Sequence, residues 1–434
     1  MADNSVFDGI SNETLVKIIK GVTFKVASNF KNKTKLAKAI SRPFDGELEY
    51  KQKGDTLEIV KDGVFKTYDG LISKREDAQV IEDDSVFAKI KGKHTLIKVN
   101  SVEEILKLPA NGFKTKGQSI AIDALVRDVE SDGFEILTST ASNVIGGGTN
   151  PFNEKYMNAA SASLNERSVY EEDRYLFINP VGNSQAIESM KDMFTPNTKY
   201  QDGKMVNAYG ISPIMSNFVV LHTVGAAASD TIVVDRIEEV KVGSINTKRV
   251  YVTGLTSKFT IGDHVYFDGI YEFNPISQKE LSGVKTFSVV NQATDNSYIE
   301  FSEEVKFNVP LQNVARAPIK GDALKVVGLA GERSYENLLI QKDCVAAIFL
   351  KDNTFKPGVV SYTVSDKDSG ISITCVLYHD PDLNETFFKI MTMYTYVIIR
   401  QEGVVVIRSS VNNILNDAPK TTVEGKSAKA TTTK

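Results

Sequence analysis

Hydrophobic and polar residues alternate most regularly between about residues 226 and 328 of this chain. Four short runs in that block carry apolar residues two positions apart, with turn residues between the runs: Val250 and Val252, Val265 and Phe267, Phe287 and Val289, and Ile299 and Phe301. A period of two places alternate side chains on one face of a β-strand, whereas a helix repeats its apolar face every three to four residues. We therefore predict a small β-barrel or sandwich, inserted into a domain of a different kind.

The N-terminal segment shows the helical period instead. Behind a candidate N-cap at Ser11 or Asn12, apolar residues recur at helical spacing: Leu15, Ile18, Ile19 and Val22. Between residues 17 and 42 the chain carries eight basic residues and no acidic one: Lys17, Lys20, Lys25, Lys31, Lys33, Lys35, Lys38 and Arg42. Such a run is usually the solvated face of a helix, and the alternative is an arm that docks on an acidic partner or on nucleic acid.

The stretch from Phe44 to Val99 is predicted to be extended and rich in charge. Turn dipeptides interrupt it at Gly54-Asp55, Asp62-Gly63 and Asp69-Gly70. An isolated two-stranded ribbon is only marginally stable in water, and this stretch has few residues with which to build its own core. We therefore expect the ribbon to lie across something else, such as a neighbouring subunit.

Helices and further strands are predicted on both sides of the β block. A helix over residues 117–140 has one apolar stripe, formed by Ile122, Leu125, Val126 and Val129. Gly133 within it is a candidate kink or end. The other predictions are helices at 153–169 and 184–195, a strand at 174–180, a helix followed by a strand at 334–350, and two strands joined by a turn at 391–408.

Composition limits the class of protein without indicating a chemistry. A chain of 434 residues with 41% hydrophobic and 24% charged residues can bury a large core, and a net charge of −4 argues against a polybasic nucleic-acid coat. The two cysteines, Cys344 and Cys375, are too far apart to suggest a disulfide framework or a zinc site. The chain shows neither a secretory signal nor an apolar run long enough for an ordinary transmembrane helix, so we expect a soluble protein made in the cytoplasm.

Candidate catalytic and metal-binding patterns are weak. The four histidines are not spaced from one another as metal ligands are: His94, His222, His264 and His379. His379 lies beside Asp380, which fits a metal or acid–base site but more often an exposed turn at Pro381. The glycine run at 146–148 lacks the lysine and the spacing of a nucleotide-binding loop. We predict no catalytic residue, no cofactor and no metal; an enzyme with a β accessory domain stays as a rival class.

Four segments of the chain share the pattern of one family. They are "KGDTLEIVKDGVFKTYDG" in the extended stretch; "LNERSVYEEDRYLFINP", with Leu164, Asn165, Tyr175, Asn179 and Pro180; "IGDHVYFDGI" and "KTFSVV…SYIEF" in the β block; and "MYTYVIIRQEGVVVI", with Tyr396, Arg400 and Glu402. In this order and spacing, from about Thr14 to Val411, they resemble the coat protein of the short-tailed Salmonella phage P22 and its relatives, which build on the Hong Kong 97-like capsid fold.

The resemblance implies an α+β protein with the Hong Kong 97-like capsid fold and an inserted all-β barrel domain. The implied parts are an N-terminal arm at 1–43, an extended loop region at 44–110, a peripheral domain at 111–170 and 395–417, an axial domain at 171–225 and 329–394, the barrel at 226–328, and a disordered tail at 418–434. The implied function is that of a major capsid protein in the virion, which self-assembles into an icosahedral head around double-stranded DNA. The alternative is another β-rich virion component, of a tail or a decoration.

The resemblance also implies partners and contact residues. The expected partners are other copies of the chain in hexamers and pentamers, the scaffolding protein, the portal protein and packaged DNA through non-specific contacts, with no membrane. The eight basic residues of the arm would contact a subunit, the scaffolding protein or DNA. A protruding loop of the barrel would join capsomers across two-fold axes, through Asp235, Arg236, Glu238, Glu239, Lys241, Lys248 and Arg249. Lysine–asparagine crosslinks, which occur in some members of the wider fold, stay open for Lys61, Lys66 and Lys74.

Overall fold

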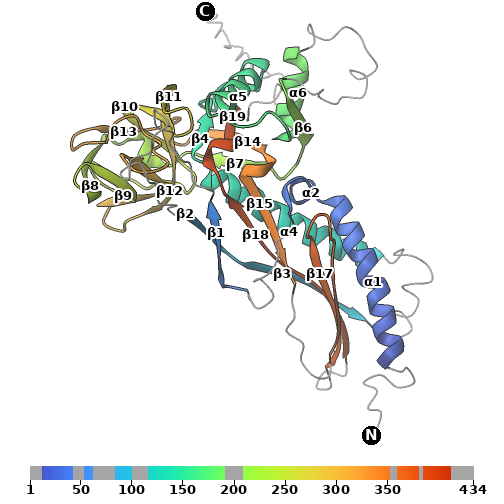
Figure 1. Cartoon of the computed structure of the whole chain (residues 1–434). Helices are drawn as coiled ribbons and strands as arrows, with labels where there is room; N and C mark the ends of the chain where they lie inside the picture. Colours follow the sequence, from blue (N-terminus) through green and yellow to red (C-terminus); the bar gives the residue numbers. More distant parts are fainter. Residues whose placement is uncertain are drawn as a thin grey trace, which may run out of the picture.

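The computed structural model describes residues 12–42, 53–61, 84–99, 116–190, 209–351, 359–380 and 385–411. They form an elongated body with a β-barrel attached on one side (Figure 1). One sheet of five strands and one of six make up the body, and a two-stranded ribbon packs on it. The predicted combination of helices and sheets with an inserted closed barrel is confirmed.

Helix α4, Lys116–Thr140, lies along the five-stranded sheet, and α1 and α2 pack on the same sheet beside it (Figure 1). The strand order is β15-β18-β17-β16, and β3 pairs with the other edge of β18. The bounds of these elements are α1 (Asn12–Lys33), α2 (Leu36–Ile40), β3 (Lys91–Val99), β15 (Val345–Leu350), β16 (Val360–Ser365), β17 (Ser372–Asp380) and β18 (Glu385–Ile398).

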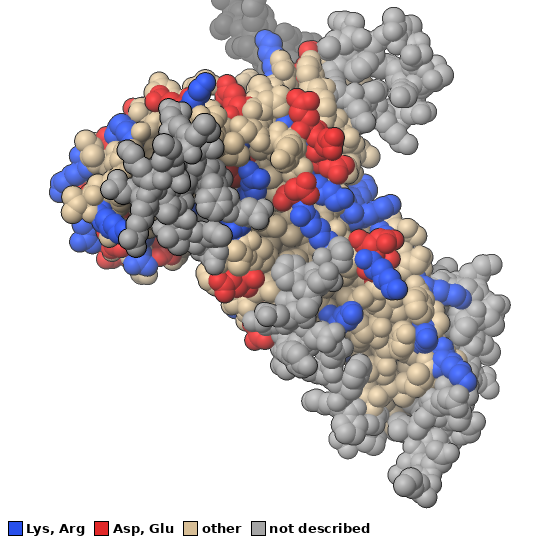
Figure 2. Space-filling model, in the orientation of Figure 1, with Lys and Arg blue, Asp and Glu red and all other residues tan. Residues whose placement is uncertain are grey.

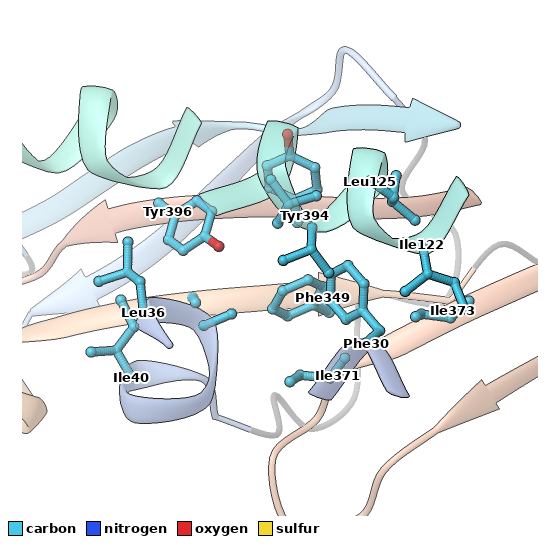
Figure 3. Packing of buried hydrophobic residues seen from close by; sticks show 14 of the residues in the cluster. Phe30, Leu36, Ile40, Ile122, Leu125, Phe349, Ile371, Ile373, Tyr394 and Tyr396 are labelled. Atoms are coloured by element: carbon cyan, nitrogen blue, oxygen red, sulfur yellow. The ribbon is translucent and has the colours of Figure 1, made fainter. Parts of the chain in front are cut away.

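The largest hydrophobic cluster fills the space between these helices and the sheet. Phe30 of α1, Ile122 and Leu125 of α4, and Phe349 and Tyr394 of the sheet are buried there (Figure 3). Full burial of an apolar side chain of this size stabilises the fold by roughly 1.5–3 kcal/mol. The predicted N-terminal helix is therefore confirmed, and it belongs to the core of its own subunit.

The six-stranded sheet forms the other end of the body. Its order is β4-β19-β14-β5-β6, with β7 pairing to β14 as well. Met157 and Leu164 of α5 pack on Leu176, Leu339 and Ile407 of this sheet. The bounds are β4 (Asn143–Ile145), α5 (Glu154–Glu166), β5 (Arg174–Ile178), α6 (Pro180–Met190), β6 (Ile211–Met215), β7 (Val220–Thr223), β14 (Arg333–Gln341) and β19 (Val404–Ser410).

The inserted block is a closed barrel, which decides between the two predicted forms. Its strands close in the order β10-β11-β12-β9-β8-β13. Phe267, Phe287 and Phe301 meet in its centre, with Phe287 and Phe301 stacked at 5.0 Å between ring centroids. The bounds are β8 (Ile232–Lys241), β9 (Ser244–Thr253), β10 (His264–Asn274), β11 (Lys279–Gln292), β12 (Tyr298–Phe307) and β13 (Ala323–Val326).

The ribbon consists of β1, Thr56–Lys61, and β2, Asp84–Lys89, paired antiparallel. Leu57 and Ile59 on its inner face pack against Ile348 and Val397 of the same chain. The expectation that the ribbon lies across something else is confirmed for this face, and the covering surface is the subunit's own β15 and β18 rather than a neighbour. Residues 62–83, between the two strands, lie outside the described residues.

The prediction of a helix at the start of 334–350 is wrong, and so is the alternative of a helix end at Gly133. The helix expected at the start of 334–350 is the strand β14, in which residues 336–341 are all buried. Because neighbouring elements cover both faces, the strand lacks the alternation of a half-exposed strand. Gly133 does not end the helix, since α4 continues to Thr140. A Cβ at Gly133 would lie 2.8 Å from the Tyr396 ring and 2.9 Å from Leu36, so this glycine permits close packing.

The domain boundaries stay a prediction. Two features of the sheets cut across them: β14 and β15 belong to different sheets although both lie in the expected axial segment, and residue 395 falls inside β18. The shorter helices are confirmed at 154–166 and 180–190, and the strand at 174–178. Residues 191–195 of the second predicted helix lie outside the described residues.

Candidate assembly surfaces

The basic residues of the predicted arm lie on α1, α2 and the residues next to them, and the body of the subunit pairs with several. Lys31 contacts Asp366 and Lys33 contacts Asp123, each with 2.5 Å between the ammonium nitrogen and a carboxylate oxygen. Arg42 contacts a further aspartate at 2.8 Å. These three cations therefore hold the arm helices to their own subunit.

The other arm lysines differ in what they touch. Lys35 donates a hydrogen bond to the carbonyl of Met215 at 2.6 Å, and the Lys20 ammonium lies 5.6 Å from the centre of a tyrosine ring of β16. Lys17 and Lys38 are exposed, and Lys25 is half-buried. Lys and Arg side chains appear along the edge of the molecule that α1 forms (Figure 2).

A buried carboxylate of α4 holds the junction between the two arm helices. The oxygens of Glu130 accept hydrogen bonds from the backbone N–H groups of Leu36 and Ala37, at 2.9 and 3.0 Å. These groups lie in the first turn of α2, where the N-cap residue Lys35 makes no capping bond with its side chain. Burial raises the pKa of Glu130, and the backbone donors oppose that rise. The arm is thus tied to the middle of α4.

The predicted protruding loop is a β-hairpin of the barrel. Its seven residues lie on β8 and β9, whose pairing reaches Lys241 and Ser244 at a two-residue turn. That turn has Gly243 at φ 77°, a conformation that glycine adopts without strain. The tip is apolar as well as charged: Val240 is 63% and Val242 99% exposed. The expected loop is therefore a two-stranded hairpin whose pairing has three register shifts.

Most charges of the hairpin have partners within the barrel. Asp235 contacts Lys320 at 2.7 Å, and Arg249 contacts Glu300 at 2.6 Å. The remaining contacts are Arg236 over the Tyr251 ring, Glu238 accepting from the Tyr251 hydroxyl, Glu239 accepting from the Gly243 N–H, and Lys248 near Glu304. Lys241, beside the turn, is exposed. The part of the hairpin that projects beyond these contacts is its tip.

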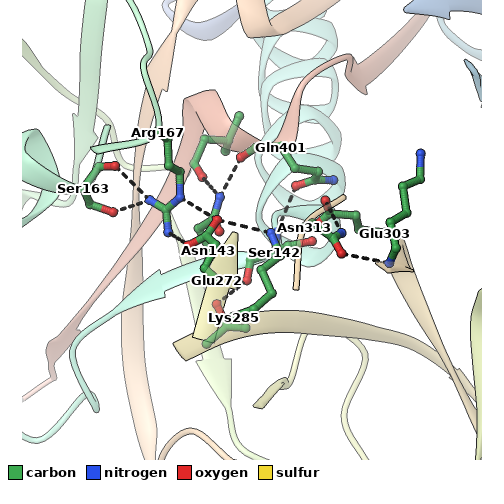
Figure 4. Close-up of polar contacts among 12 residues, drawn as sticks. Ser142, Asn143, Ser163, Arg167, Glu272, Lys285, Glu303, Asn313 and Gln401 are labelled. Atoms are coloured by element: carbon green, nitrogen blue, oxygen red, sulfur yellow. Dashed lines mark hydrogen bonds and ion pairs between the residues drawn. The ribbon is translucent and has the colours of Figure 1, made fainter. Parts of the chain in front are cut away.

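Buried charges join the barrel to the body. Arg167, which follows α5, makes two hydrogen bonds to Glu272 of β10 at 2.9 and 2.7 Å (Figure 4). Lys285 of β11 lies 3.6 Å from Glu272 and 3.0 Å from Glu303. Burial alone would raise the pKa of Glu272, but Arg167 and Lys285 outweigh it and lower the pKa to about 2. Four alternating charges thus form a neutral buried chain, which sequence reasoning missed because its members lie far apart in sequence.

The candidate chemical residues do not form a metal site in the described part of the chain. Among the described residues, no group of three or more His, Cys, Asp or Glu side chains could hold a metal ion. His379 lies in β17, 3.2 Å from the Thr386 hydroxyl, so the turn expected there does not include it; residues 381–384 lie outside the described residues. Burial raises the pKa of the thiols of Cys344 and Cys375 to about 12, which keeps both protonated.

The glycine run packs on the six-stranded sheet, and a cavity lies where the barrel meets the body. A Cβ at Gly148 would lie 2.8 Å from Ser334 of β14, so this loop packs tightly on the sheet. A cavity of about 390 Å³ lies between the barrel, the ribbon and the turn from β18 to β19. In its lining, Glu304 contacts Lys306 at 3.1 Å and Lys248 at 3.8 Å. In the part of the chain that the structure describes, no helix is long and apolar enough to cross a membrane.

Most of the chain matches one known protein family. Residues 11–406 match the family model described as the P22 coat protein, gene protein 5. No curated protein matches the chain in sequence. Similar solved structures include the capsid of the cyanophage P-SCSP1u, with 11% identity, a TM-score of 0.42 and coverage of 88% of this chain and 89% of that one.

Two further solved structures are similar at the same level. A structure from Mycobacterium phage Che8 has 12% identity and a TM-score of 0.38, with coverage of 86% of this chain and 91% of that one. A virus-like particle from Pyrococcus furiosus has 10% identity and a TM-score of 0.36, with coverage of 90% and 98%.

Proposed function

The chain belongs to the P22 coat protein family, and we propose that its subunits join as hexamers and pentamers around double-stranded DNA. As a member of that family it is a major capsid protein, a structural component of the virion that forms the icosahedral shell. The observation that carries this conclusion is the extent of the match, residues 11–406, which includes α1, α4, the barrel and the start of β19. The family also confirms the resemblance and the Hong Kong 97-like fold class, and it replaces the alternative of a tail or decoration component.

The outer face of the ribbon supports a contact between subunits. Val60 is 57% and Phe87 64% exposed, while the inner face of the same two strands is buried on the body. Exposed large apolar side chains on an ordered ribbon favour burial against another protein surface. A heterologous contact that repeats from subunit to subunit builds closed rings, as hexamers and pentamers require. We place a second copy of the chain on this face.

The arm and the hairpin carry the other proposed contacts. Lys38 is exposed on α2, so the proposed contact with the scaffolding protein or DNA rests on it rather than on the ion-paired Lys31 and Lys33. The hairpin tip, with Val240 and the turn after it, is the proposed contact between capsomers. The portal protein is expected to join the shell at one vertex.

The test of this function is assembly of the full-length chain. The purified protein, produced alone and together with its phage's scaffolding protein, is examined by sedimentation and negative-stain electron microscopy. We expect closed shells of uniform diameter in at least one of the two preparations. Fibres or rosettes in both preparations would point to a different virion component and overturn the proposal.

A further inference from the structure

The C-terminal end of α4 meets the barrel through consecutive carbonyl groups. The last carbonyls of a helix have no partner within the helix and need donors from elsewhere. Here four successive carbonyls each accept a side-chain hydrogen bond: Ser139 from Ser288, Thr140 from Gln401, Ala141 from His264 and Ser142 from Thr286, at 2.5, 3.0, 2.9 and 2.6 Å. Three of these donors belong to the barrel. Ser288 binds a carbonyl in the last turn of α4, whereas His264 and Thr286 bind the two carbonyls that directly follow the helix. The barrel is therefore tied to the C-terminal end of α4.

His264 is the donor whose chemistry can change. It is fully buried at the start of β10, and its Nε2 donates to the carbonyl of Ala141. Its Nδ1 lies 3.1 Å from an Nη2 of Arg408 on β19. A guanidinium has only donors, so Nδ1 must accept. Both contacts together therefore require a neutral imidazole with its single proton on Nε2.

Arg408 cannot turn away from the histidine, because its other groups are fixed. Its guanidinium contacts Glu336 of β14 at 3.0 Å and donates to the carbonyl of Val327 at 2.8 Å. Its side chain is fully buried. A proton added to Nδ1 of His264 would thus point an N–H at a fixed cation, and both the hydrogen bond and the charge balance would be lost.

The other charged groups around His264 do not supply a counter-charge bonded to it. Asp263, the preceding residue, accepts from His222 of β7 at 2.8 Å and from the backbone N–H groups of Gly225 and Thr260. Glu336 is held by Arg408. Burial lowers the pKa of His264 well below its ordinary value, and Arg408 lowers it further.

We propose that His264 is the pivot of an acid-sensitive joint between barrel and body. While neutral, the imidazole ties the end of α4 to the barrel and, through Arg408, to the central strands of the six-stranded sheet. Protonation of Nδ1 leaves the Nε2 hydrogen bond in place but turns the contact with Arg408 into a repulsion between two cations, and this favours local opening of the joint between β10, β19 and the end of α4. This inference concerns the single subunit and does not depend on the proposed hexamers and pentamers.

The sign of the pH dependence follows from linkage. The closed joint excludes the proton, whereas an opened joint exposes a histidine with an ordinary pKa of about 6.5. Opening is therefore nearly independent of pH well above 6.5 and rises as the pH falls through 6.5, with a slope that approaches about tenfold per pH unit below that range. Glu336, whose pKa is raised by burial, favours the closed joint as the pH falls toward 4.5 and so opposes the effect. Variants at position 264 keep Glu336, and comparison with them isolates the histidine.

The test is native-state hydrogen exchange of the full-length subunit between pH 5.5 and 7.5, corrected for intrinsic exchange rates. We expect protection of the amides around residues 139–143 and 262–266 to fall about fivefold from pH 6.5 to 5.5 in the wild type. His264→Gln and His264→Asn, which carry no titratable group, should change less than twofold. Amides inside the barrel should stay protected in all three proteins, which separates opening of the joint from unfolding. A pH-independent wild type, or the same slope in a variant, would overturn the proposal.

A measurement on the wild type alone covers the case that neither variant folds. In protein labelled with ¹⁵N-histidine, the His264 signals should report a protonated Nε2 and an unprotonated Nδ1 that stay unchanged from pH 7.5 to 5.5 in the closed subunit. A His264 ring that titrates with a midpoint near 6.5 in the folded protein contradicts the required tautomer and refutes the proposal.

Discussion

Glu130 and Gly133 lie less than one turn apart on α4, and both act on the N-terminal arm. Glu130 binds the first backbone N–H groups of α2, and Gly133 leaves room for Leu36 of the same helix. Neither role is visible in the sequence, where Glu130 is one of several acidic residues of a helix and the glycine resembles a helix end. At the residue scale, the arm is positioned by groups that belong to another element.

The role of Gly133 leads to a prediction with an internal control. Gly133→Ala adds a methyl group into contact with Tyr396 and Leu36 and should destabilise the subunit by about 1–3 kcal/mol. At Gly21, on α1, a Cβ meets nothing within 4 Å. Gly21→Ala should therefore stabilise the subunit by about 0.5–1 kcal/mol, as expected for a helix interior. Denaturant unfolding of both variants measures the difference, and equal stabilisation by the two would show that the close approach at Gly133 has no energetic role.

A second prediction at the residue scale concerns the stability provided by the buried charge pairs that join the barrel to the body. Arg167→Met leaves the Glu272 carboxylate buried with only Lys285 nearby and should cost about 3–5 kcal/mol. Arg167→Met combined with Glu272→Gln leaves the pair of Lys285 and Glu303 and should cost clearly less. A double-mutant cycle by denaturant unfolding measures this coupling. Costs that simply add would exclude a direct interaction.

The same carboxylate predicts a pH dependence. The pKa of Glu272 is lowered to about 2 in the folded state from 4.5, so its contribution to stability is complete above pH 4.5 and is lost as the pH falls toward 2. Acid unfolding of the wild type should therefore be steeper below pH 4.5 than that of the double variant.

At the scale of elements, we expect the tip of the hairpin of β8 and β9 to contribute to assembly but not to the stability of the single subunit. Val240 and Val242 are exposed at its tip and contact no hydrophobic cluster of the barrel. Val240→Ser with Val242→Ser should change the free energy of unfolding of the subunit by less than about 0.5 kcal/mol. The same variant should lower the yield of shells in sedimentation, because the tip is a proposed contact between capsomers. Wild-type shell yield would remove the hairpin from the assembly surface.

Whether a strand could be predicted from the sequence depended on the residues on its two faces and on whether neighbouring elements cover one face or both. The barrel strand around Val250 is covered on one face, so its apolar and polar residues alternate in the sequence. The strand around Phe287 is buried on both faces, but Thr286 and Ser288 on its outer face are polar, so the alternation persists and predicts the inserted β block. β14 is buried on both faces, its alternation is absent, and it was mistaken for a helix. The arm lysines were recognised as a set, but their partners Asp123 and Asp366 come from distant segments, so pairing could not be foreseen. The joints of the barrel were missed for the same reason.

At the scale of the whole molecule, a self-contained barrel is attached to an elongated body by polar contacts. The hydrophobic clusters of the barrel and the body are separate, and buried ion pairs and helix-capping bonds connect them. Hydrophobic burial holds each unit together, whereas the polar joints fix their relative orientation, because hydrogen bonds demand specific geometry. A shell subunit needs both properties, since its outer contacts repeat only if every copy has the same shape.

Cryo-electron microscopy of the assembled particles tests the central claim most directly. We expect a closed icosahedral shell whose map resolves hexamers and pentamers of this chain. In that map, the Val60 and Phe87 face of the ribbon is buried against a second copy, and the barrel is joined to α4 as in the single subunit. A particle without pentamers and hexamers, or a map in which that ribbon face is open to solvent in every subunit, would contradict it.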